Sequence, residues 1–290
     1  MKILVTGSNG QLGNEMRLVA SELTNHDFIF TDVAELDITD RKAVTAFFEQ
    51  HHPDMVVNCA AYTDVNRAES DLERAELINA TAPKILADCC KANGAKFIHV
   101  STDYVFDGSA HLPYKETDKE NPVSAYGTTK YHGEQNIVAS GCEYVIIRTC
   151  WLYSSFGKNF VKTMATLGAT KEELGVVFDQ VGTPTYAADL AAAIATIISK
   201  TAQDPAAFVK GIYHFSNEGV CSWYDFTVAI MDLYNLKCRI KPIHTEEYPT
   251  PANRPAYSVL DKTKIKTTFG IAIPHWYESL QRCVAKLKLA

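Results

Sequence analysis

Three glycines near the start of the chain constrain its fold more than any other feature. Gly7, Gly10 and Gly13 stand in Gly-Ser-Asn-Gly-Gln-Leu-Gly, between the apolar run Lys2–Thr6 and a helical pattern that begins at Gln11. Glycines at this spacing between a strand and a helix permit a tight turn, the close approach of a pyrophosphate and close helix–strand packing. The segment therefore predicts the first unit of a dinucleotide-binding fold.

Short apolar runs alternate with longer helical patterns through the first half of the chain. The runs are almost continuously apolar, as parallel strands are when helices cover both faces of their sheet. The expected strands are Lys2–Thr6, Phe28–Phe30, Met55–Asn58, Phe97–Val100 and Tyr144–Arg148. The expected helices are Gln11–Ser21, Arg41–His51 with Asp40 as N-cap, Leu72–Asn93 with Gly94 as C-cap, and Tyr126–Ala139. This alternation predicts an α/β fold with a Rossmann-type doubly wound parallel sheet.

The pattern is looser after Arg148. We expect an NAD(P)-binding Rossmann domain over residues 1–150 and a smaller C-terminal, mainly substrate-binding region over 151–290, with some segments (about 176–215) returning to the sheet. The expected elements are strands at Val176–Phe178 and Ile212–Phe215 and helices at Ala187–Lys200, Trp223–Tyr234 and His275–Lys288. Pro242, Pro249, Pro251 and Pro255 predict a loop between the last two helices.

Composition excludes several classes of protein. The net charge of −6 lacks the basic footprint of a nucleic-acid binder. No two of the eight cysteines form a C-x-x-C pair, which favours reduced, buried thiols over a zinc or redox site. The N-terminal apolar run is too short for a signal peptide, and no stretch approaches the roughly 20 apolar residues of a membrane span. The sequence predicts a cytoplasmic protein with no nucleic-acid or membrane partner.

An acidic residue follows the second expected strand. Asp32 lies where a carboxylate accepts hydrogen bonds from the ribose hydroxyls of an adenine dinucleotide. The alternative role is a helix cap or a solvated turn residue. No Lys or Arg lies in residues 28–40 to balance a 2′-phosphate, so we expect NADH to serve at least as well as NADPH.

Tyr126 and Lys130 form a candidate catalytic pair. Residues four apart on a helix share a face. A tyrosine has an ordinary pKa near 10, and a neighbouring ammonium lowers it toward the range of a general acid. Ser101 and Thr102 end the fourth expected strand, where a hydroxyl can bind a substrate oxygen that gains charge. Alone, the pair is also compatible with an exposed helix face and the hydroxyls with a turn, so the dinucleotide motif decides between these readings.

With these residues the sequence resembles the extended short-chain dehydrogenase/reductases, and among them the reductases of dTDP-4-keto-6-deoxy sugars. The matching segments are Gly-Ser-Asn-Gly-Gln-Leu-Gly at 7–13, Asn-Cys-Ala-Ala-Tyr-Thr at 58–63, Ala-Glu at 68–69, Leu-Ile-Asn-Ala-Thr at 77–81, Ser-Thr-Asp-Tyr-Val-Phe at 101–106, Tyr-Gly-x-x-Lys at 126–130, Arg-Thr-x-Trp-x-Tyr at 148–153, Asn-Phe-x-Lys-Thr-Met at 159–164 and Arg-Pro-x-x-Ser-x-Leu at 254–260. The resemblance implies reduction of the C4 keto group of dTDP-4-dehydro-6-deoxy-L-mannose with hydride from NADPH or NADH.

The resemblance also implies roles for individual residues. Tyr126 would protonate the sugar C4 oxygen, Lys130 would lower the pKa of Tyr126 and hold the nicotinamide ribose, and Thr102 would polarise the carbonyl. Asp103, Trp151 and Arg254 would contact the dTDP-sugar substrate, although Trp151 also suits core packing and Arg254 suits a surface salt bridge equally well. The residues expected to contact the cofactor are Gly7, Gly10, Gln11, Leu12, Gly13, Asp32, Asp37, Ile38, Ala61, Tyr62, Thr63, Tyr126 and Lys130.

Some relatives of this kind bind magnesium at a dimer interface. This sequence has no acidic tail that would match such a site. The chain ends in Lys286-Leu287-Lys288-Leu289-Ala290, so we expect no metal site, and a homodimer remains open. Two other functions also remain open. One is a sugar-nucleotide epimerase or dehydratase on the same fold, and the other is a non-catalytic regulatory subunit like one that accompanies methionine adenosyltransferase. The presence of Thr102, Tyr126 and Lys130 favours an enzyme.

Overall fold

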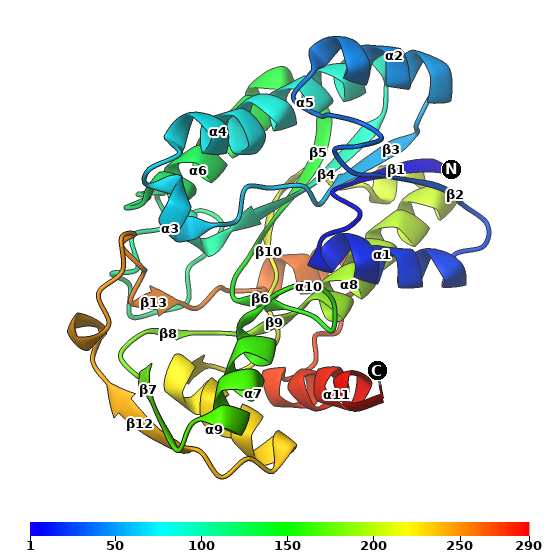
Figure 1. The fold of residues 1–290 in the computed structure, drawn as a ribbon. Helices are drawn as coiled ribbons and strands as arrows, with labels where there is room; N and C mark the ends of the chain where they lie inside the picture. Colours follow the sequence, from blue (N-terminus) through cyan, green and yellow to red (C-terminus); the bar gives the residue numbers. More distant parts are fainter. Residues whose placement is uncertain (290) are drawn as a thin grey trace.

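The structure is a computed structural model that describes residues 1–289. Its centre is a sheet of six parallel strands in the order β10-β5-β4-β3-β1-β2 (Figure 1). The strands are β1 (Lys2–Thr6), β2 (Asp27–Thr31), β3 (Met55–Asn58), β4 (Lys96–Thr102), β5 (Glu143–Thr149) and β10 (Gly211–His214). The predicted Rossmann-type sheet is confirmed. β2 and β3 leave β1 on opposite sides, so the crevice expected of such sheets lies at the carboxyl end of β1.

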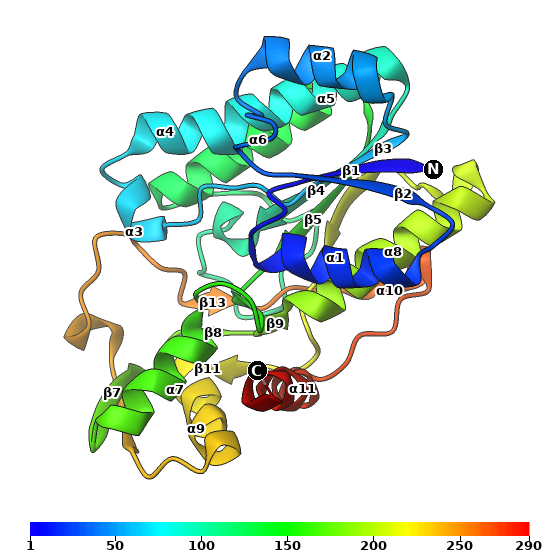
Figure 2. The ribbon, with the colours of Figure 1, turned by 45° about the vertical axis from the view of Figure 1, so that its right-hand side comes forward.

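Helices cover both faces of the sheet, as Figures 1 and 2 show. Ile3 and Val5 of β1 pack in one apolar cluster with α1 and α8, whereas Leu4 packs in the other with α2 and α5. Successive side chains of a strand point to opposite faces, so a strand covered on both sides is apolar throughout. The covering helices are α1 (Gln11–Glu22), α2 (Arg41–His51), α5 (Ala82–Asn93), α6 (Ala125–Ser140), α8 (Ala187–Gln203) and α10 (Thr263–Phe269).

The single helix expected over Leu72–Asn93 is divided in the structure. It consists of α4 (Leu72–Glu76), a π-helical turn η1 (Leu77–Thr81) and α5, and a short helix α3 (Val65–Ala68) precedes it. A Cβ on Gly133 of α6 would lie 2.1 Å from the carbonyl oxygen of Asn79, so the π turn is pressed against a glycine of the neighbouring helix. The two predicted caps are confirmed. Asp40 accepts the N–H of Lys42 at 2.8 Å, and Gly94 adopts a φ of +69° after α5.

The C-terminal region forms a third apolar cluster below the sheet in Figure 1. Within about 176–215, β10 lies in the central sheet and α8 packs beside α1, whereas β7 (Glu173–Val177) pairs with β12 (Arg239–Ile243) in a separate two-stranded sheet. The remaining elements are β6 (Leu152–Tyr153), α7 (Phe160–Thr170), β7 (Glu173–Val177), β8 (Val181–Gly182), β9 (Thr185–Tyr186), β11 (Cys221–Ser222), α9 (Trp223–Tyr234), β12 (Arg239–Ile243), β13 (Tyr257–Ser258) and α11 (Trp276–Leu289), with 3-10 turns at Asp103–Val105, Pro205–Ala207 and Thr245–Glu247.

The loop predicted from four prolines is wrong where β12, β13 and α10 lie. Pro242 lies inside β12, which tolerates it because β12 has a partner on one side only and its other edge needs no N–H donor. The helix α10 follows the last proline and was not predicted. All eight cysteines are free and seven of them are buried. Within residues 1–289, no helix combines the length and apolarity needed to cross a membrane.

Candidate active site

A cavity of about 1100 Å³ opens at the carboxyl ends of the central strands. Its wall combines the glycine loop, the ends of β2 and β4, the start of α6 and parts of the C-terminal region. The expected site residues on this wall are Gly7, Gly10, Gln11, Leu12, Asp32, Asp37, Ile38, Ala61, Thr63, Thr102, Asp103, Tyr126, Lys130, Trp151 and Arg254. Residues separated by more than half the chain therefore meet in one place.

Two residues expected to contact the cofactor lie behind the wall instead. Ala61 and Thr63 line the cavity, whereas Tyr62 between them does not. The Tyr62 N–H donates to Asn79 Oδ1 at 2.8 Å, which fixes this segment to the π turn. Gly13 also lies behind the wall, where a Cβ would come within 2.4 Å of the Gly7 carbonyl oxygen. Both residues shape the cavity without lining it.

The glycine loop presents backbone to the cavity. Gly7 has a φ of +66°, and a Cβ there would lie 2.5 Å from the nitrogen of Ala60, so only glycine fits. Gly10 is the N-cap residue of α1, and no side chain caps the helix. Its first N–H groups and the positive end of its dipole therefore face the cavity and suit an anion.

Asp32 lies directly after β2 and is partly engaged. Its carboxylate accepts the N–H of Asn9 at 2.9 Å and the N–H of Val33 at 2.8 Å. The first bond joins the end of β2 to the glycine loop. Asp32 has further acceptor positions on its two oxygens, so it remains suited to receive a hydroxyl.

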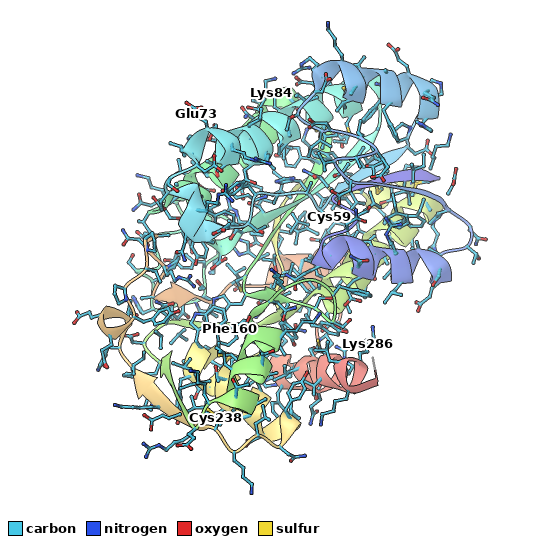
Figure 3. All side chains as sticks on the ribbon, viewed as in Figure 1. Cys59, Glu73, Lys84, Phe160, Cys238 and Lys286 are labelled. Atoms are coloured by element: carbon cyan, nitrogen blue, oxygen red, sulfur yellow. The ribbon has the colours of Figure 1, made fainter. Side chains whose placement is uncertain are left out.

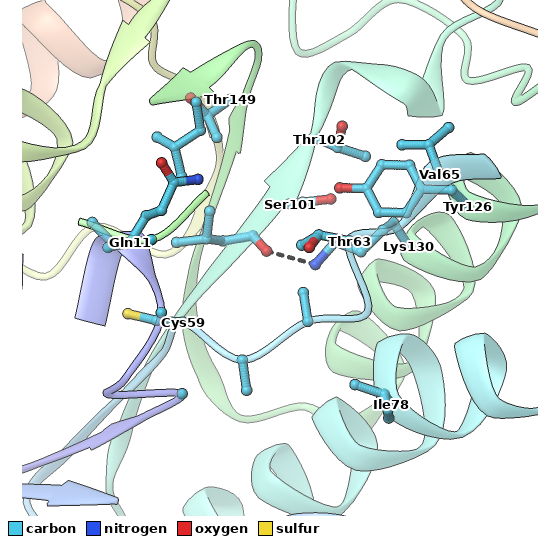
Figure 4. Close-up of a pocket in the computed structure, with 18 of the residues that line it drawn as sticks. Gln11, Cys59, Thr63, Val65, Ile78, Ser101, Thr102, Tyr126, Lys130 and Thr149 are labelled. Atoms are coloured by element: carbon cyan, nitrogen blue, oxygen red, sulfur yellow. Dashed lines mark hydrogen bonds between the residues drawn. The ribbon is translucent and has the colours of Figure 1, made fainter. Parts of the chain in front are cut away.

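Tyr126, Ser101 and Thr102 converge at the end of β4 (Figure 4). Ser124 caps α6 by accepting the N–H of Gly127 at 3.1 Å, which places Tyr126 in the first turn. Burial raises the pKa of Tyr126 to about 12, and a hydrogen bond with Thr102 acts in the opposite direction. The predicted lowering of this pKa by Lys130 is therefore not what the structure shows, because burial dominates. Tyr126 is a protonated phenol at neutral pH.

Lys130 is buried beneath the tyrosine, one helical turn further along α6. Its ammonium nitrogen Nζ lies 2.7 Å from the Val100 carbonyl oxygen, the bond drawn as a dashed line in Figure 4, and 3.2 Å from His99 Nε2. Burial lowers the pKa of Lys130 from 10.5 to about 8, while the nearby Glu134 acts to raise it. Lys130 Nζ thus lies within hydrogen-bond distance of the Val100 carbonyl and the His99 imidazole rather than of Tyr126.

Two polar atoms close to the tyrosine lack partners. They are Ser101 Oγ and Asp103 Oδ2, both buried. The other carboxyl oxygen of Asp103 accepts the Thr102 hydroxyl at 3.0 Å, and burial raises the pKa of Asp103 to about 6. Unpaired buried polar atoms are costly, so such atoms on a cavity wall suit a polar ligand. In the described part of the chain, no group of three or more His, Cys, Asp or Glu side chains is placed to hold a metal ion.

Aromatic side chains form the far end of the cavity. Trp151 stacks on Trp223 with ring centroids 3.5 Å apart and planes 11° from parallel, and both line the cavity. Trp151 has a φ of +49°, and Gly182 makes room for its indole, which a Cβ at 182 would approach within 2.8 Å. Phe160, labelled in Figure 3, also packs against Trp223, with ring centroids 4.5 Å apart. Arg254 also lines this end, and its Nε has no partner.

Sequence reasoning missed several residues of this site. Trp223 was assigned only to a helix, although Ser222 and Asp225 form the capping box that fixes the start of α9 at Trp223. Asn58 and His99 were assigned only to strands. Polar residues within otherwise apolar strands were the available signal for these two.

Comparisons with known proteins agree with this geometry. The chain matches the family model for the RmlD substrate binding domain over residues 1–289. It is 42% identical to the spore coat polysaccharide biosynthesis protein SpsK of Bacillus subtilis (strain 168), over 97% of this chain and 95% of that protein. It is 38% identical to a dTDP-4-dehydrorhamnose reductase of Sinorhizobium fredii, over 100% of this chain and 98% of that protein.

Two solved structures resemble this one closely. A dTDP-4-dehydrorhamnose reductase from Clostridium acetobutylicum is 45% identical, with a TM-score of 0.94 over 99% of this chain and 100% of that one. A dTDP-4-dehydrorhamnose reductase from Bacillus anthracis, solved in complex with NADP, is 37% identical, with a TM-score of 0.90 over 98% and 99% of the two chains.

Proposed function

Because the chain belongs to the dTDP-4-dehydrorhamnose reductase family, we propose that it reduces the C4 keto group of dTDP-4-dehydro-6-deoxy-L-mannose to give dTDP-L-rhamnose, with NADPH or NADH as hydride donor. The observation that carries the proposal is the single cavity that joins the glycine loop to Tyr126 and to the two stacked tryptophans. Relatives that match this chain along nearly their whole length bear the name of this reaction. The Bacillus anthracis relative was solved with NADP.

The residues present fit a dinucleotide. The uncapped start of α1 suits the pyrophosphate, and no side chain at Gly7 or Gly10 obstructs its approach. Asp32 suits the adenosine ribose through its remaining acceptor positions. When bound, the reduced nicotinamide supplies the hydride, and every other requirement of the reaction falls on side chains of this chain.

Reduction of a ketone needs one proton at the oxygen as the hydride arrives at the carbon. Tyr126 holds that proton, because its raised pKa keeps the phenol protonated at neutral pH. We infer that it donates the proton to the sugar C4 oxygen while the Thr102 hydroxyl binds the same oxygen. Lys130 would hold the nicotinamide ribose, and Arg254 at the far end would pair with the diphosphate of the substrate.

A dehydratase would need more than this site offers. It must remove a proton beside the carbonyl and expel a hydroxyl, which requires a second acid–base pair near the sugar. The position after Asp103 holds Tyr104, and burial together with Asp103 raises the pKa of that phenol further. Tyr104 is therefore no base at neutral pH, and reduction is favoured. Homodimer formation, cytoplasmic location and the absence of nucleic-acid and membrane partners stay predictions of the sequence.

The test is a stoichiometric assay. Incubation with a dTDP-4-keto-6-deoxy sugar and NADH or NADPH should consume one reduced nicotinamide per sugar and yield the reduced deoxysugar. Omission of the sugar should stop the consumption. Purified protein that retains NAD⁺ and dehydrates a dTDP-hexose without added cofactor would overturn the proposal.

A further inference from the structure

A network of buried polar side chains leads to Lys130, and the proposed reaction uses none of its other members. It consists of Thr6 at the end of β1, Asn58 at the end of β3, His99 in β4 and Lys130 in α6, each at most 1% exposed. Thr6 Oγ1 lies 2.7 Å from Asn58 Oδ1, Asn58 Nδ2 lies 3.0 Å from His99 Nδ1, and His99 Nε2 lies 3.2 Å from Lys130 Nζ. Such a buried network has few ways to place its protons.

At one end of this network, the direction of the hydrogen bonds is fixed. The backbone N–H of Ala60 can only donate, and it meets Asn58 Oδ1 at 3.1 Å. The Thr6 hydroxyl donates to the same oxygen. An exchange of the amide oxygen and nitrogen of Asn58 would set two donors against each other at Ala60. The amide nitrogen of Asn58 therefore faces His99.

That direction determines the proton on His99. The Asn58 amide nitrogen only donates, so His99 Nδ1 must accept, and the ring carries its proton on Nε2. A doubly protonated ring would have no acceptor at Nδ1. In agreement, burial holds the pKa of His99 well below its ordinary value.

The proton on His99 Nε2 in turn affects the protonation of Lys130. An Nε2–H that points at Nζ forms a hydrogen bond only if the nitrogen has a free lone pair, which an ammonium lacks. Nζ keeps a hydrogen to donate to the Val100 carbonyl oxygen. The groups that face the lysine are His99 and Val100 from β4 and Tyr126 and Glu134 from its own helix, and Glu134 is itself paired with the buried Arg148.

We propose that His99 is a positioning residue that donates its Nε2–H to Lys130 and thereby favours the uncharged amine of that lysine over its ammonium form in the cofactor-free protein. The proposal rests on the proposed function only for the catalytic importance of Lys130. The direction of the hydrogen bonds stands without it.

The structure supplies an internal control. His214 in β10 is also buried, and burial lowers its pKa to about 3. Its Nδ1 faces the carbonyl oxygen of Tyr114 at 3.0 Å, which can only accept, so His214 must carry its proton on Nδ1. The two buried, neutral histidines are thus expected to be opposite tautomers.

Nitrogen-15 NMR of histidine-labelled, cofactor-free protein tests this directly. We expect the Nε2–H tautomer for His99 and the Nδ1–H tautomer for His214 from pH 6.5 to 8.5, with His214→Gln to assign the control signal. A protonated Nδ1 on His99 would overturn the proposal whether or not the protein reduces a dTDP-sugar. Conversely, an inactive protein with the expected tautomers would contradict only the proposed function.

Asn58→Asp provides the second measurement. A carboxylate at 58 accepts on both oxygens, so it should draw the His99 proton to Nδ1 and leave Nε2 to accept from a Lys130 ammonium. Carbon-13 NMR of lysine-labelled protein, assigned with Lys130→Met, should show Lys130 titrating in the wild type near the value of about 8 that its burial favours. In Asn58→Asp the pKa of Lys130 should rise by at least one unit, so the lysine should lose its proton at a proton concentration at least tenfold lower than in the wild type. An unchanged His99 tautomer in this variant would contradict the proposal.

Discussion

The two ends of the cavity are built in different ways. At the glycine-loop end, Gly7, Gly10 and the start of α1 present backbone to the cavity, and the shape depends on the absence of Cβ atoms at Gly7 and Gly13. At the aromatic end, Trp151, Trp223 and Arg254 come from three separate segments and present side chains. The first kind of site is written locally in the sequence, whereas the second exists only after the chain has folded.

The groups proposed to perform the chemistry lie between these ends, so a change there should stop turnover without disturbing either one. Tyr126→Phe removes the proton but keeps the ring and its edge-on contact with Tyr104. We expect turnover to fall by about 10²-fold or more, the scale of acid catalysis, with little change in the KM values for NADH and for the sugar. Steady-state kinetics would measure both.

Tyr131→Phe is the matched control for this change. Tyr131 lies on the same helix and packs against an apolar cluster but does not itself line the cavity, so its hydroxyl should not matter. Tyr126→Phe with the turnover of the wild type would remove Tyr126 from its proposed role.

A buried carboxyl group near Tyr126 should make stability depend on pH. Asp103 has a folded-state pKa of about 6 against an ordinary 3.8. The folded protein therefore retains this proton between about pH 4 and 6, where the unfolded chain has lost it, and stability falls as pH rises through that window. Relative to Asp103→Asn, the wild type should lose up to about 3 kcal/mol between pH 4 and 7 at roughly 1.4 kcal/mol per pKa unit.

Urea unfolding of both proteins across this pH range provides the measurement. Asp107 should show the opposite sign, since hydrogen bonds led by Ser109 hold its pKa at about 2. The stability that Asp107 contributes should be lost as pH falls from about 4 to 2. A difference between wild type and Asp103→Asn that stays constant from pH 4 to 7 would contradict the raised pKa.

The aromatic end should be specific for the sugar nucleotide. Trp223→Leu removes the stacking partner of Trp151 but keeps an apolar side chain at the start of α9. Aromatic pairs contribute about 0.5–1.5 kcal/mol beyond the area that they bury, so we expect the KM for the dTDP-sugar to rise up to about tenfold. The KM for NADH should not change.

Trp276→Phe is the control for the aromatic end. Trp276 packs edge-on against Phe226 in the same apolar cluster but does not line the cavity. Equal effects of Trp223→Leu and Trp276→Phe on the sugar KM would show that packing, and not contact with the substrate, explains them.

The same difference, between features encoded by local sequence and features that depend on tertiary neighbours, explains which elements could be predicted from the sequence. Continuous apolar runs and the glycine spacing predicted the sheet, because a strand covered on both faces and a backbone that needs positive φ leave local signatures. The pairing of β7 with β12, the π turn at Asn79 and the position of Trp223 were not predictable, since each depends on a tertiary neighbour such as Gly133 or Phe160. The pKa of Tyr126 was predicted in the wrong direction because sequence spacing shows the neighbouring lysine but not the burial.

The smallest expected effect concerns Asp32, at the glycine-loop end, where preference between NADH and NADPH should be decided. Asp32→Asn keeps an oxygen that can accept the Asn9 N–H but removes the charge. Asp32 is only half-buried, so water screens its repulsion of a 2′-phosphate to about 1 kcal/mol at 4 Å, or roughly a fivefold change. We expect the wild type to use NADH at least as well as NADPH, and the variant to shift the ratio of specificity constants toward NADPH by about that factor.

Glu35→Gln is the control for this change. The Glu35 carboxylate accepts the Asp32 N–H at 2.8 Å but does not line the cavity, so removal of its charge should shift the ratio less. A wild type that favours NADPH by more than about tenfold would show that contacts other than Asp32 determine the choice, and the glycine-loop end would then be less locally encoded than its sequence indicates.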